Sequence, residues 1–309
     1  MEKSVNQPTA RFLLQPGTLW SKTTEQTKLA RQCGALKSIE TEYHLIQQQD
    51  ISFVVRTLSN LARKEQASKK QHQQEHQTGQ RIDPFLPYES DLFVGDLSPS
   101  HLCLLNKFNV VNNHLLIVTR DFESQTDLLN LQDFTALWYC LQEIDGLAFF
   151  NGGKTAGASQ SHKHLQLIPL PFLPNVMHRP LEEAIANITF KNSLGKLDSF
   201  DFCHGVAALN ISNQHSAEVA AETMLQRYHA LLDYVGFKIA SQTQKQPGAY
   251  NFLATREWMM IVPRSRESFQ NIPINSLGFA GSLFVKDQSS LKLLQQLTPL
   301  KLLTKVAFT

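Results

Sequence analysis

The sequence lacks the cysteine patterns and long apolar runs that mark secreted, metal-binding or membrane-spanning proteins. It has four cysteines, and none of them forms a Cys-x-x-Cys pair: Cys33, Cys103, Cys140 and Cys203. A structural zinc or thioredoxin-like site is therefore not expected, and isolated buried thiols in a reducing compartment are the simpler interpretation. The N-terminus carries no apolar signal-peptide core, and no apolar run approaches the ~18–20 residues of a membrane span. We therefore expect a soluble, cytoplasmic protein.

An excess of charge of either sign is also missing. The 29 basic and 27 acidic residues leave a formal net charge of +2. Because no global basic field results, the composition does not favour nucleic acid or an anionic membrane as the main partner. Any recognition of phosphate must come from a local site. Hydrophobic residues make up 42% of the 309 residues, which is enough for a sizeable core in one large domain or two ordinary ones.

One internal segment is nearly devoid of apolar side chains. Residues 65–80 read EQASKKQHQQEHQTGQ, a composition that cannot bury a core and predicts a mobile surface loop. His72 and His76 stand four residues apart and could share one face of a metal-binding helix. No further ligands accompany them, so a solvated loop is the favoured interpretation.

The rest of the chain shows the hydrophobic periodicity of short strands and amphipathic helices. Strands are expected over residues 51–56, 91–97, 101–107, 114–119 and 147–150, and as a hairpin over 251–255 and 258–263. Helices are expected over residues 21–34, 130–144, 180–188, 217–235 and 289–297. Several consecutive strands before a helix are typical of an α+β fold with a mostly antiparallel sheet. The C-terminal elements either complete this sheet or form a lobe of their own.

The most informative stretch is NGGKTAGASQSHKHLQ, which runs from Asn151 to Gln166. A loop of small residues leads here into His162-x-His164-x-Gln166. In an extended strand, residues two apart point to the same face, so this spacing predicts one row of two imidazoles and an amide. The apolar run over residues 167–171 gives such a strand a buried anchor.

Three interpretations of this row compete. Alternating strand histidines can bind a metal, but a catalytic metal site usually needs a third protein ligand, and His114 and His204 lack diagnostic spacing. The row can also be structural, since most strand histidines are simply satisfied core or surface residues. In the third interpretation, one imidazole attacks a phosphorus atom.

Nucleophilic attack explains more of the stretch than the other two interpretations. A neutral imidazole, with an ordinary pKa of ~6.5, is a good nucleophile near pH 7 if an acceptor holds its other ring nitrogen. The phosphoryl oxygens need donors, and the loop offers backbone N–H groups at Gly157, Ala158, Ser159 and Gln160. Gln166 can orient a phosphate oxygen, but its amide cannot act as a general acid or base. Water would then be poorly activated, and a covalent nucleotidyl-histidine would await a better acceptor such as phosphate.

The motif and its loop resemble the histidine-triad superfamily. They are most similar to its transferase branch, the diadenosine tetraphosphate (Ap4A) phosphorylases, also called ATP adenylyltransferases. Further blocks carry the resemblance, in order, over most of residues 51–290: residues 83–88 (DPFLPY), 92–96 (LFVGD), 104–109 (LLNKFN), 114–120 (HLLIVTR), 250–258 (YNFLATREW), 262–265 (VPRS) and 275–281 (NSLGFAG). The resemblance implies an α+β, histidine-triad fold like that of galactose-1-phosphate uridylyltransferase.

The resemblance implies reversible cleavage of Ap4A with phosphate to ATP and ADP, through a ping-pong mechanism. We accordingly divide the chain into an N-terminal helical and polar segment (1–50), a catalytic core (51–175) and a C-terminal part that completes the sheet and the nucleotide site (176–309). Small nucleotides would be the partners, and a divalent cation such as Mg²⁺ would accompany the polyphosphate, without an organic cofactor. A related transferase acting on a nucleotide sugar, or a nucleotide sensor with little turnover, are the alternatives.

The resemblance also implies roles for individual residues. His164 would be the nucleophile, His162 would position it, and Gln166 would bind the transferred α-phosphate. The other substrate-binding residues would be Lys64, Gly95, Asp96, Asn151, Gly157, Ala158, Ser159, Gln160, Asn275, Ser276, Leu277 and Lys286. Lys154 and Arg120 could add positive charge for a tetraphosphate. Ser282 stands where the family pattern leads us to expect a bulkier apolar residue.

Overall fold

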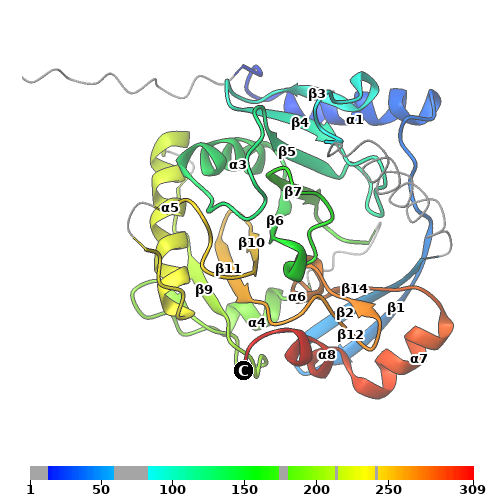
Figure 1. Cartoon of the computed structure of the whole chain (residues 1–309), viewed down its shortest axis with the longest axis vertical. Coiled ribbons are helices and arrows are strands. Elements are labelled where there is room, and N and C mark those ends of the chain that lie inside the picture. The colour runs from blue at the N-terminus through cyan, green and yellow to red at the C-terminus, as the bar shows by residue number, and fades with distance from the viewer. Residues whose placement is uncertain (1–12, 59–82, 174–179, 213–214, 241–242) are drawn as a thin grey trace, which may run out of the picture.

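The computed structural model of the chain describes residues 13–58, 83–173, 180–212, 215–240 and 243–309. The expected loop at 65–80, with Lys64, His72 and His76, lies outside these residues. The centre of the molecule is a nine-stranded sheet in which all neighbouring strands are antiparallel (Figure 1). Its strands, in spatial order, are β3 (Phe93–Asp96), β4 (His101–Leu105), β5 (Leu115–Thr119), β7 (His164–Pro169), β6 (Gly146–Gly152), β10 (Tyr250–Ala254), β11 (Trp258–Pro263), β9 (Gly205–Ala208) and β8 (Leu194–Gly195). The α+β prediction is confirmed, and the sheet takes strands from both sides of residue 175.

Three helices cover one face of this sheet: α1 (Leu19–Gln32), α3 (Leu131–Glu143) and α5 (Ala217–Tyr234). The buried residues of α3 run without a break from Asp133 to Leu141, because the helix packs against α1 and α5 as well as against the strands. Asn130 caps the helix by accepting the N–H groups of Gln132 and Asp133, and the Asp133 carboxylate accepts the Asn130 N–H in return. This reciprocal cap fixes where α3 begins.

The other face carries a second, smaller layer. A three-stranded sheet is formed by β1 (Thr41–Gln48), β2 (Ile51–Leu58) and β14 (Ser282–Val285), in which β14 is parallel to β2. It shares an apolar cluster with the large sheet and with the surrounding helices, namely α4 (Glu182–Ala186), α6 (Ser276–Phe279), α7 (Gln288–Leu297) and α8 (Pro299–Val306). Short elements complete the described chain: β12 (Ser268–Phe269), β13 (Ile272–Pro273), and the 3-10 turns η1 (Ser90–Leu92) and η2 (Lys154–Ala156).

Most of the expected elements are confirmed, with ends shifted by a few residues. The strand at residues 41–48 was missed, because its sequence TEYHLIQQ is polar and lies at the edge of the small sheet. The short β8, β9 and β14 were also missed: β9 and β14 pair with strands far away in the sequence, and β8 has only two residues. Another difference concerns the thiols: Cys33 is exposed, whereas Cys103 and Cys140 are buried.

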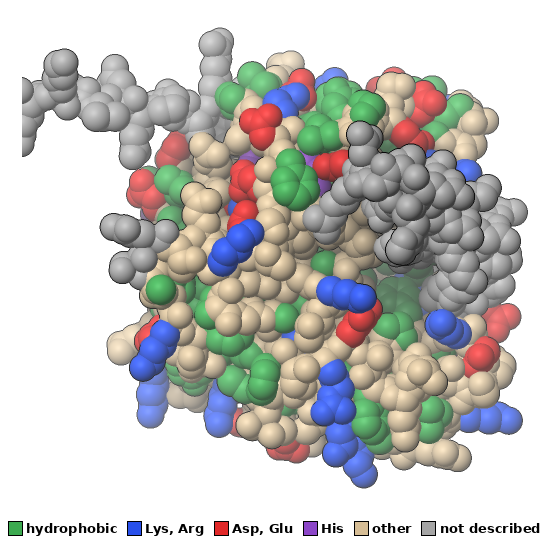
Figure 2. Space-filling model, viewed as in Figure 1, with side chains coloured by type: hydrophobic (Ala, Val, Ile, Leu, Met, Phe, Trp, Pro, Cys, Tyr) green, Lys and Arg blue, Asp and Glu red, His purple; other side chains and the backbone are tan. Residues whose placement is uncertain are grey.

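The surface agrees with the nearly balanced charge of the sequence. On the described part of the face in Figure 2, basic side chains are interspersed with acidic ones. Among the described residues, no helix is both long enough and apolar enough to cross a bilayer.

Candidate active site

The central strand β7 places the histidine motif between the two layers. It begins at His164, which pairs with Val118 of β5, and Gln166 lies opposite Phe149 of β6. His164 and Gln166 therefore point away from the face that α3 covers. His162 precedes the strand, yet the ring of Phe85 contacts both imidazoles, with centroids 5.7 Å from His162 and 5.2 Å from His164. The two histidines thus lie side by side, although only the second is in the strand.

The hydrogen bonds of His164 define its tautomer. Its Nδ1 lies 2.8 Å from the carbonyl oxygen of His162, which can only accept, so Nδ1 carries the proton. In the neutral ring, Nε2 then holds the lone pair. Burial lowers the pKa of His164 to about 4, and the side chain is 5% exposed. The ring is therefore neutral and nucleophilic at Nε2 near pH 7.

His162 is held differently. Its Nδ1 contacts the Asp83 carboxylate at 2.7 Å, and its Nε2 lies 2.8 Å from the carbonyl oxygen of Thr119. Its Nε2 also lies 2.9 Å from the hydroxyl oxygen of Thr119, so both ring nitrogens are engaged by groups of the protein. This geometry is compatible with the positioning role that the resemblance implies for His162, which stays a prediction.

Gln166 is oriented by a second histidine. Its Oε1 lies 3.0 Å from Nε2 of His114, a ring that the sequence had suggested only as a possible metal ligand. Since an amide oxygen can only accept, His114 donates to Gln166, and the Gln166 side chain lines both cavities described below. His204, the other suggested ligand, is packed among phenylalanine rings and accepts the N–H of Leu197 through Nε2.

Two adjoining cavities open beside these side chains. The larger, about 290 Å³, is lined by His164, and the smaller, about 240 Å³, by His114. Residues shared by both cavities are Asn106, Phe108, Gly157, Gln166 and Asn275. The lining of the larger cavity combines apolar side chains, among them Phe85, Leu92, Leu104 and Leu116, with polar ones, among them Asn151, Ser159, Gln160 and His164. Such a mixed lining suits a ligand that has both apolar and polar parts.

The loop before the motif is folded tightly on itself. Gly157 has φ +91°, and a Cβ there would lie 2.9 Å from Cβ of Asn275, so only glycine fits. The N–H groups of Gly157 and Ala158 donate to the carbonyls of Lys154 and Gly153. The loop thus uses these two N–H groups itself, and their expected contact with phosphate stays a prediction. Ser159 and Gln160 line the larger cavity, as expected.

Asn151 is fixed by residues far away in the sequence. Its Oδ1 accepts from Asn251 Nδ2 at 2.9 Å, and from the backbone N–H and hydroxyl of Ser276 at 2.9 and 2.8 Å. Ser276 is completely buried and supports Asn151, whereas Asn275 lines both cavities and Leu277 the smaller one. The expected C-terminal segment thus reaches the site.

Two residues that the sequence analysis did not single out complete this frame. Gln125 joins the ends of β6 and β7, since its amide accepts the N–H of His164 and donates to the carbonyl of Asn151. Arg264 is buried and donates to Asn251 Oδ1 at 2.6 Å and to the carbonyl of Ile274 at 2.9 Å. Burial lowers the pKa of Arg264 to about 10, so it stays charged near pH 7.

Several residues that were expected to contact the substrate lie outside the two cavities. Gly95 and Asp96 are on β3, at the edge of the sheet, and Asp96 pairs with Arg120. Lys154 and Lys286 are exposed, and Ser282 is buried on β14. Of these residues, none lines the cavities described above, so their contacts with substrate stay predictions. Within the described chain, no three His, Cys, Asp or Glu side chains are grouped to hold a metal ion.

Comparisons with known proteins agree with this geometry. The family model described as Ap4A phosphorylase N-terminal domain matches residues 9–187, and that described as ATP adenylyltransferase C-terminal domain matches residues 198–309. Diadenosine 5',5'''-P1,P4-tetraphosphate phosphorylase 2 of Saccharomyces cerevisiae is 31% identical over 234 residues, which cover 68% of this chain and 70% of the relative.

Solved structures give the same likeness. Yeast Ap4A phosphorylase Apa2 superposes with a TM-score of 0.74 at 26% identity, over 97% of this chain and 96% of that one. Apa2 in complex with AMP gives a TM-score of 0.71 at 26% identity, over 96% of this chain and 98% of the other.

Proposed function

Because the chain belongs to the Ap4A phosphorylase and ATP adenylyltransferase family, we propose that its cavities bind Ap4A and that it cleaves this substrate with phosphate to ATP and ADP. The observation that carries the proposal is the pair of side chains that share the larger cavity. His164 presents an unprotonated Nε2, and Gln166 presents an amide without acid or base chemistry. AMP bound to the yeast relative supports a nucleotide in this site.

The reaction proceeds in two displacements at one phosphorus. Nε2 of His164 forms a bond to an α-phosphorus of Ap4A, and the bond from that phosphorus to its bridging oxygen breaks, which releases ATP. An oxygen of inorganic phosphate then attacks the adenylyl group, the P–N bond breaks, and ADP leaves with His164 restored. Run in reverse, the same steps make Ap4A from ATP and ADP.

The His162 carbonyl matters in both displacements. When Nε2 bonds to phosphorus, the ring becomes cationic, and the carbonyl already bound to Nδ1–H stabilises that charge without reorganisation. Gln166, held by His114, donates to a non-bridging oxygen as negative charge shifts onto it. Neither residue activates water, so the anionic phosphate is the competent second nucleophile.

We further propose that Mg²⁺ enters with the tetraphosphate. Among the described residues, the side chains offer no group of three carboxylate or imidazole ligands. Phosphate oxygens and water would therefore supply most of the coordination, as Mg²⁺ usually permits at nucleotide sites. The ion would neutralise the polyphosphate while His164 performs the attack.

The proposal is tested by dependence on phosphate. Ap4A incubated with the protein should give ATP and ADP only when phosphate is added. ATP and AMP without phosphate would identify a hydrolase, and turnover of a nucleotide sugar but not of Ap4A would identify a different transferase.

A second experiment tests the nucleophile. Substrate labelled in the adenylyl group should modify the wild-type protein and the exposed-site control His215→Ala, but not His164→Ala. Labelling that survives His164→Ala would refute the assignment. Turnover of the labelled protein by phosphate, with label appearing in ADP, would confirm the second displacement.

A further inference from the structure

Lys163 stands between the two histidines of the motif, but its side chain lies on the opposite face of the sheet. The ammonium is completely buried, 2.8 Å from Asp133 Oδ2 and 2.7 Å from Glu123 Oε2. Burial alone would lower the pKa of Lys163, yet the two carboxylates outweigh it and raise that pKa above its usual value. The lysine is therefore a paired interior charge and takes no part in binding the tetraphosphate.

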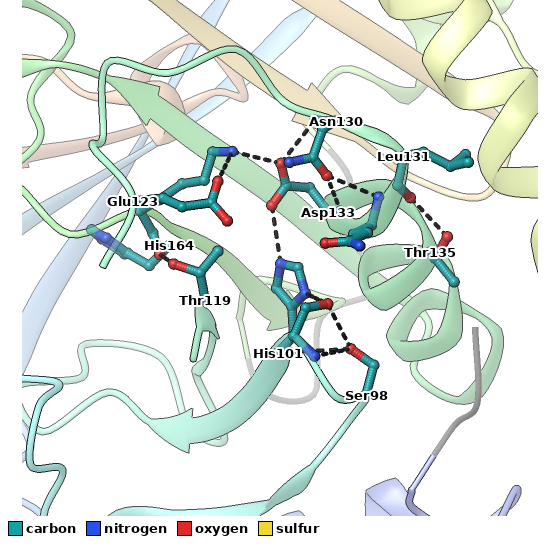
Figure 3. A network of polar contacts seen from close by, with 12 residues as sticks. Ser98, His101, Thr119, Glu123, Asn130, Leu131, Asp133, Thr135 and His164 are labelled. Carbon is teal, nitrogen blue, oxygen red and sulfur yellow. Dashed lines mark hydrogen bonds and ion pairs between the residues drawn. The ribbon is translucent and has the colours of Figure 1, made fainter. Parts of the chain in front are cut away.

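Asp133 connects this lysine to helix α3 and strand β4. Its Oδ1 lies 3.0 Å from His101 Nε2, and its Oδ2 accepts the N–H of Asn130 at 2.8 Å, so the same carboxylate serves the helix cap (Figure 3). Burial opposes ionisation of Asp133, but His101 and Lys163 keep its pKa below the usual value. The charge network is thus fixed to two rigid elements.

The backbone at Lys163 carries the group that orients the nucleophile. The carbonyl of His162, directly before it, accepts the Nδ1–H of His164. The ladders that join β7 to its neighbours begin only at His164 and Gln166, so residues 162 and 163 lie beyond them. There the backbone pairs with residues 123–125 on one side and with Thr119 on the other, and the N–H of Lys163 donates to the carbonyl of Glu123 at 2.8 Å. The buried ion pairs add an anchor through the side chain.

We propose that Lys163 is a positioning residue for adenylyl transfer. Its ion pairs with Asp133 and Glu123 hold the motif against α3 and set where the His162 carbonyl meets the imidazole of His164. The inference rests on the proposed function, because it takes His164 as the nucleophile. A displacement of about 1 Å at a reacting group costs on the order of 10²-fold in rate, so the anchor acts on the chemical step.

Lys163→Met tests this role, because methionine keeps the length of the side chain and removes the charge. The rate constant for adenylylation of His164, in a single turnover at saturating Ap4A, should fall ~10- to 100-fold. The Kd for Ap4A should stay within ~3-fold, because no substrate contact is removed. Lys301→Met, at an exposed lysine of α8, is the matched control and should keep the wild-type rate.

Further variants separate positioning from folding. Lys163→Met leaves a buried carboxylate at Asp133, whereas the double variant Lys163→Met/Asp133→Asn removes both charges and should fold. Glu123→Gln keeps the Asp133 pair and should lower the rate less than Lys163→Met. If the folded double variant and Glu123→Gln both adenylylate His164 at the wild-type rate, the positioning role is overturned.

The tautomer of His164 gives a readout that needs no substrate. In ¹⁵N-histidine spectra near pH 7, the wild type should show the Nδ1–H form, and the folded double variant a mixture of both forms. An unchanged tautomer and rate in an active enzyme would overturn the role of Lys163 alone. Absence of Ap4A phosphorolysis in the wild type would instead refute the proposed function, whatever the tautomer.

Discussion

At the scale of single residues, the burial of His164 determines the pH range in which the protein can react. Its pKa is lowered from 6.5 to about 4, chiefly by desolvation, so the neutral ring persists in mildly acidic solution. We expect the acidic limb of kcat/KM for Ap4A to bend near pH 4 and not near pH 6.5. Initial rates at pH 4–8, in buffers of constant ionic strength, measure this limb.

Folding must be followed in the same experiment, because His204 is also buried and its pKa is likewise lowered to about 4 by desolvation. The neutral form of such a group contributes stability that is full above the unfolded pKa of ~6.5 and is lost as pH falls towards 4. Circular dichroism at each pH identifies the folded range. A bend near pH 6.5 in folded protein would contradict the assigned pKa of His164.

The candidate site residues of the histidine motif could be singled out from the sequence, but most of their hydrogen-bond partners could not. His164, Gln166 and Asn151 lie in one short stretch, where alternation and small residues signal a site. Asn251 and Ser276 reach Asn151 from 100 and 125 residues away, and no local pattern announces such contacts. Side-chain partners depend on how the sheet closes, and that is a property of the whole chain.

At the scale of elements, the N-terminus of α3 is fixed by its cap. Asn130→Ala removes the acceptor for the N–H groups of Gln132 and Asp133. We expect a loss of ~1 kcal/mol in the free energy of unfolding, measured by urea denaturation. Asn130→Ser, which keeps a capping oxygen, is the control and should stay close to the wild type. An equal loss in both variants would show that the cap is not the cause.

Elements whose signals lie within their own residues were predicted, whereas elements that depend on distant contacts were missed. Helix α3 was found because its apolar stripe and its end signals lie within the element. Strand β1 was missed because an edge strand buries little, and its residues Thr41–Gln48 alternate only weakly. The site loop was predicted, but its use of the Gly157 and Ala158 N–H groups was not, because loop conformation depends on contacts such as that with Asn275.

At the scale of the whole molecule, Arg264 ties helix α8 to the hydrogen-bonded frame around Asn151. It donates to Asn251, to the carbonyl of Ile274 and, through Nε, to the carbonyl of Val306 in α8. Arg264→Lys keeps a charge but loses the planar fork, and each buried acceptor left unpaired costs ~1–3 kcal/mol. We expect the free energy of unfolding to fall by at least ~2 kcal/mol, with a lower kcat/KM for Ap4A.

Arg256→Lys is the matched control, since Arg256 also donates to backbone carbonyls, at Leu141 and Gln142, but away from the cavities. It should lose less stability and keep the wild-type KM. Denaturation and steady-state kinetics on both variants make the comparison. Equal kinetics for the two would show that Arg264 serves only the fold.

The pairing of β2 with β14 has a consequence for folding during protein synthesis. Ile51–Leu58 is synthesised long before its parallel partner, Ser282–Val285. Until β14 has been synthesised, the apolar side chains of Phe53 and Val55, which are buried in the folded molecule, therefore lack their final neighbours. Exposed apolar segments make a nascent chain prone to aggregation, so the order of synthesis sets a period of risk that lasts until β14 can pair with β2.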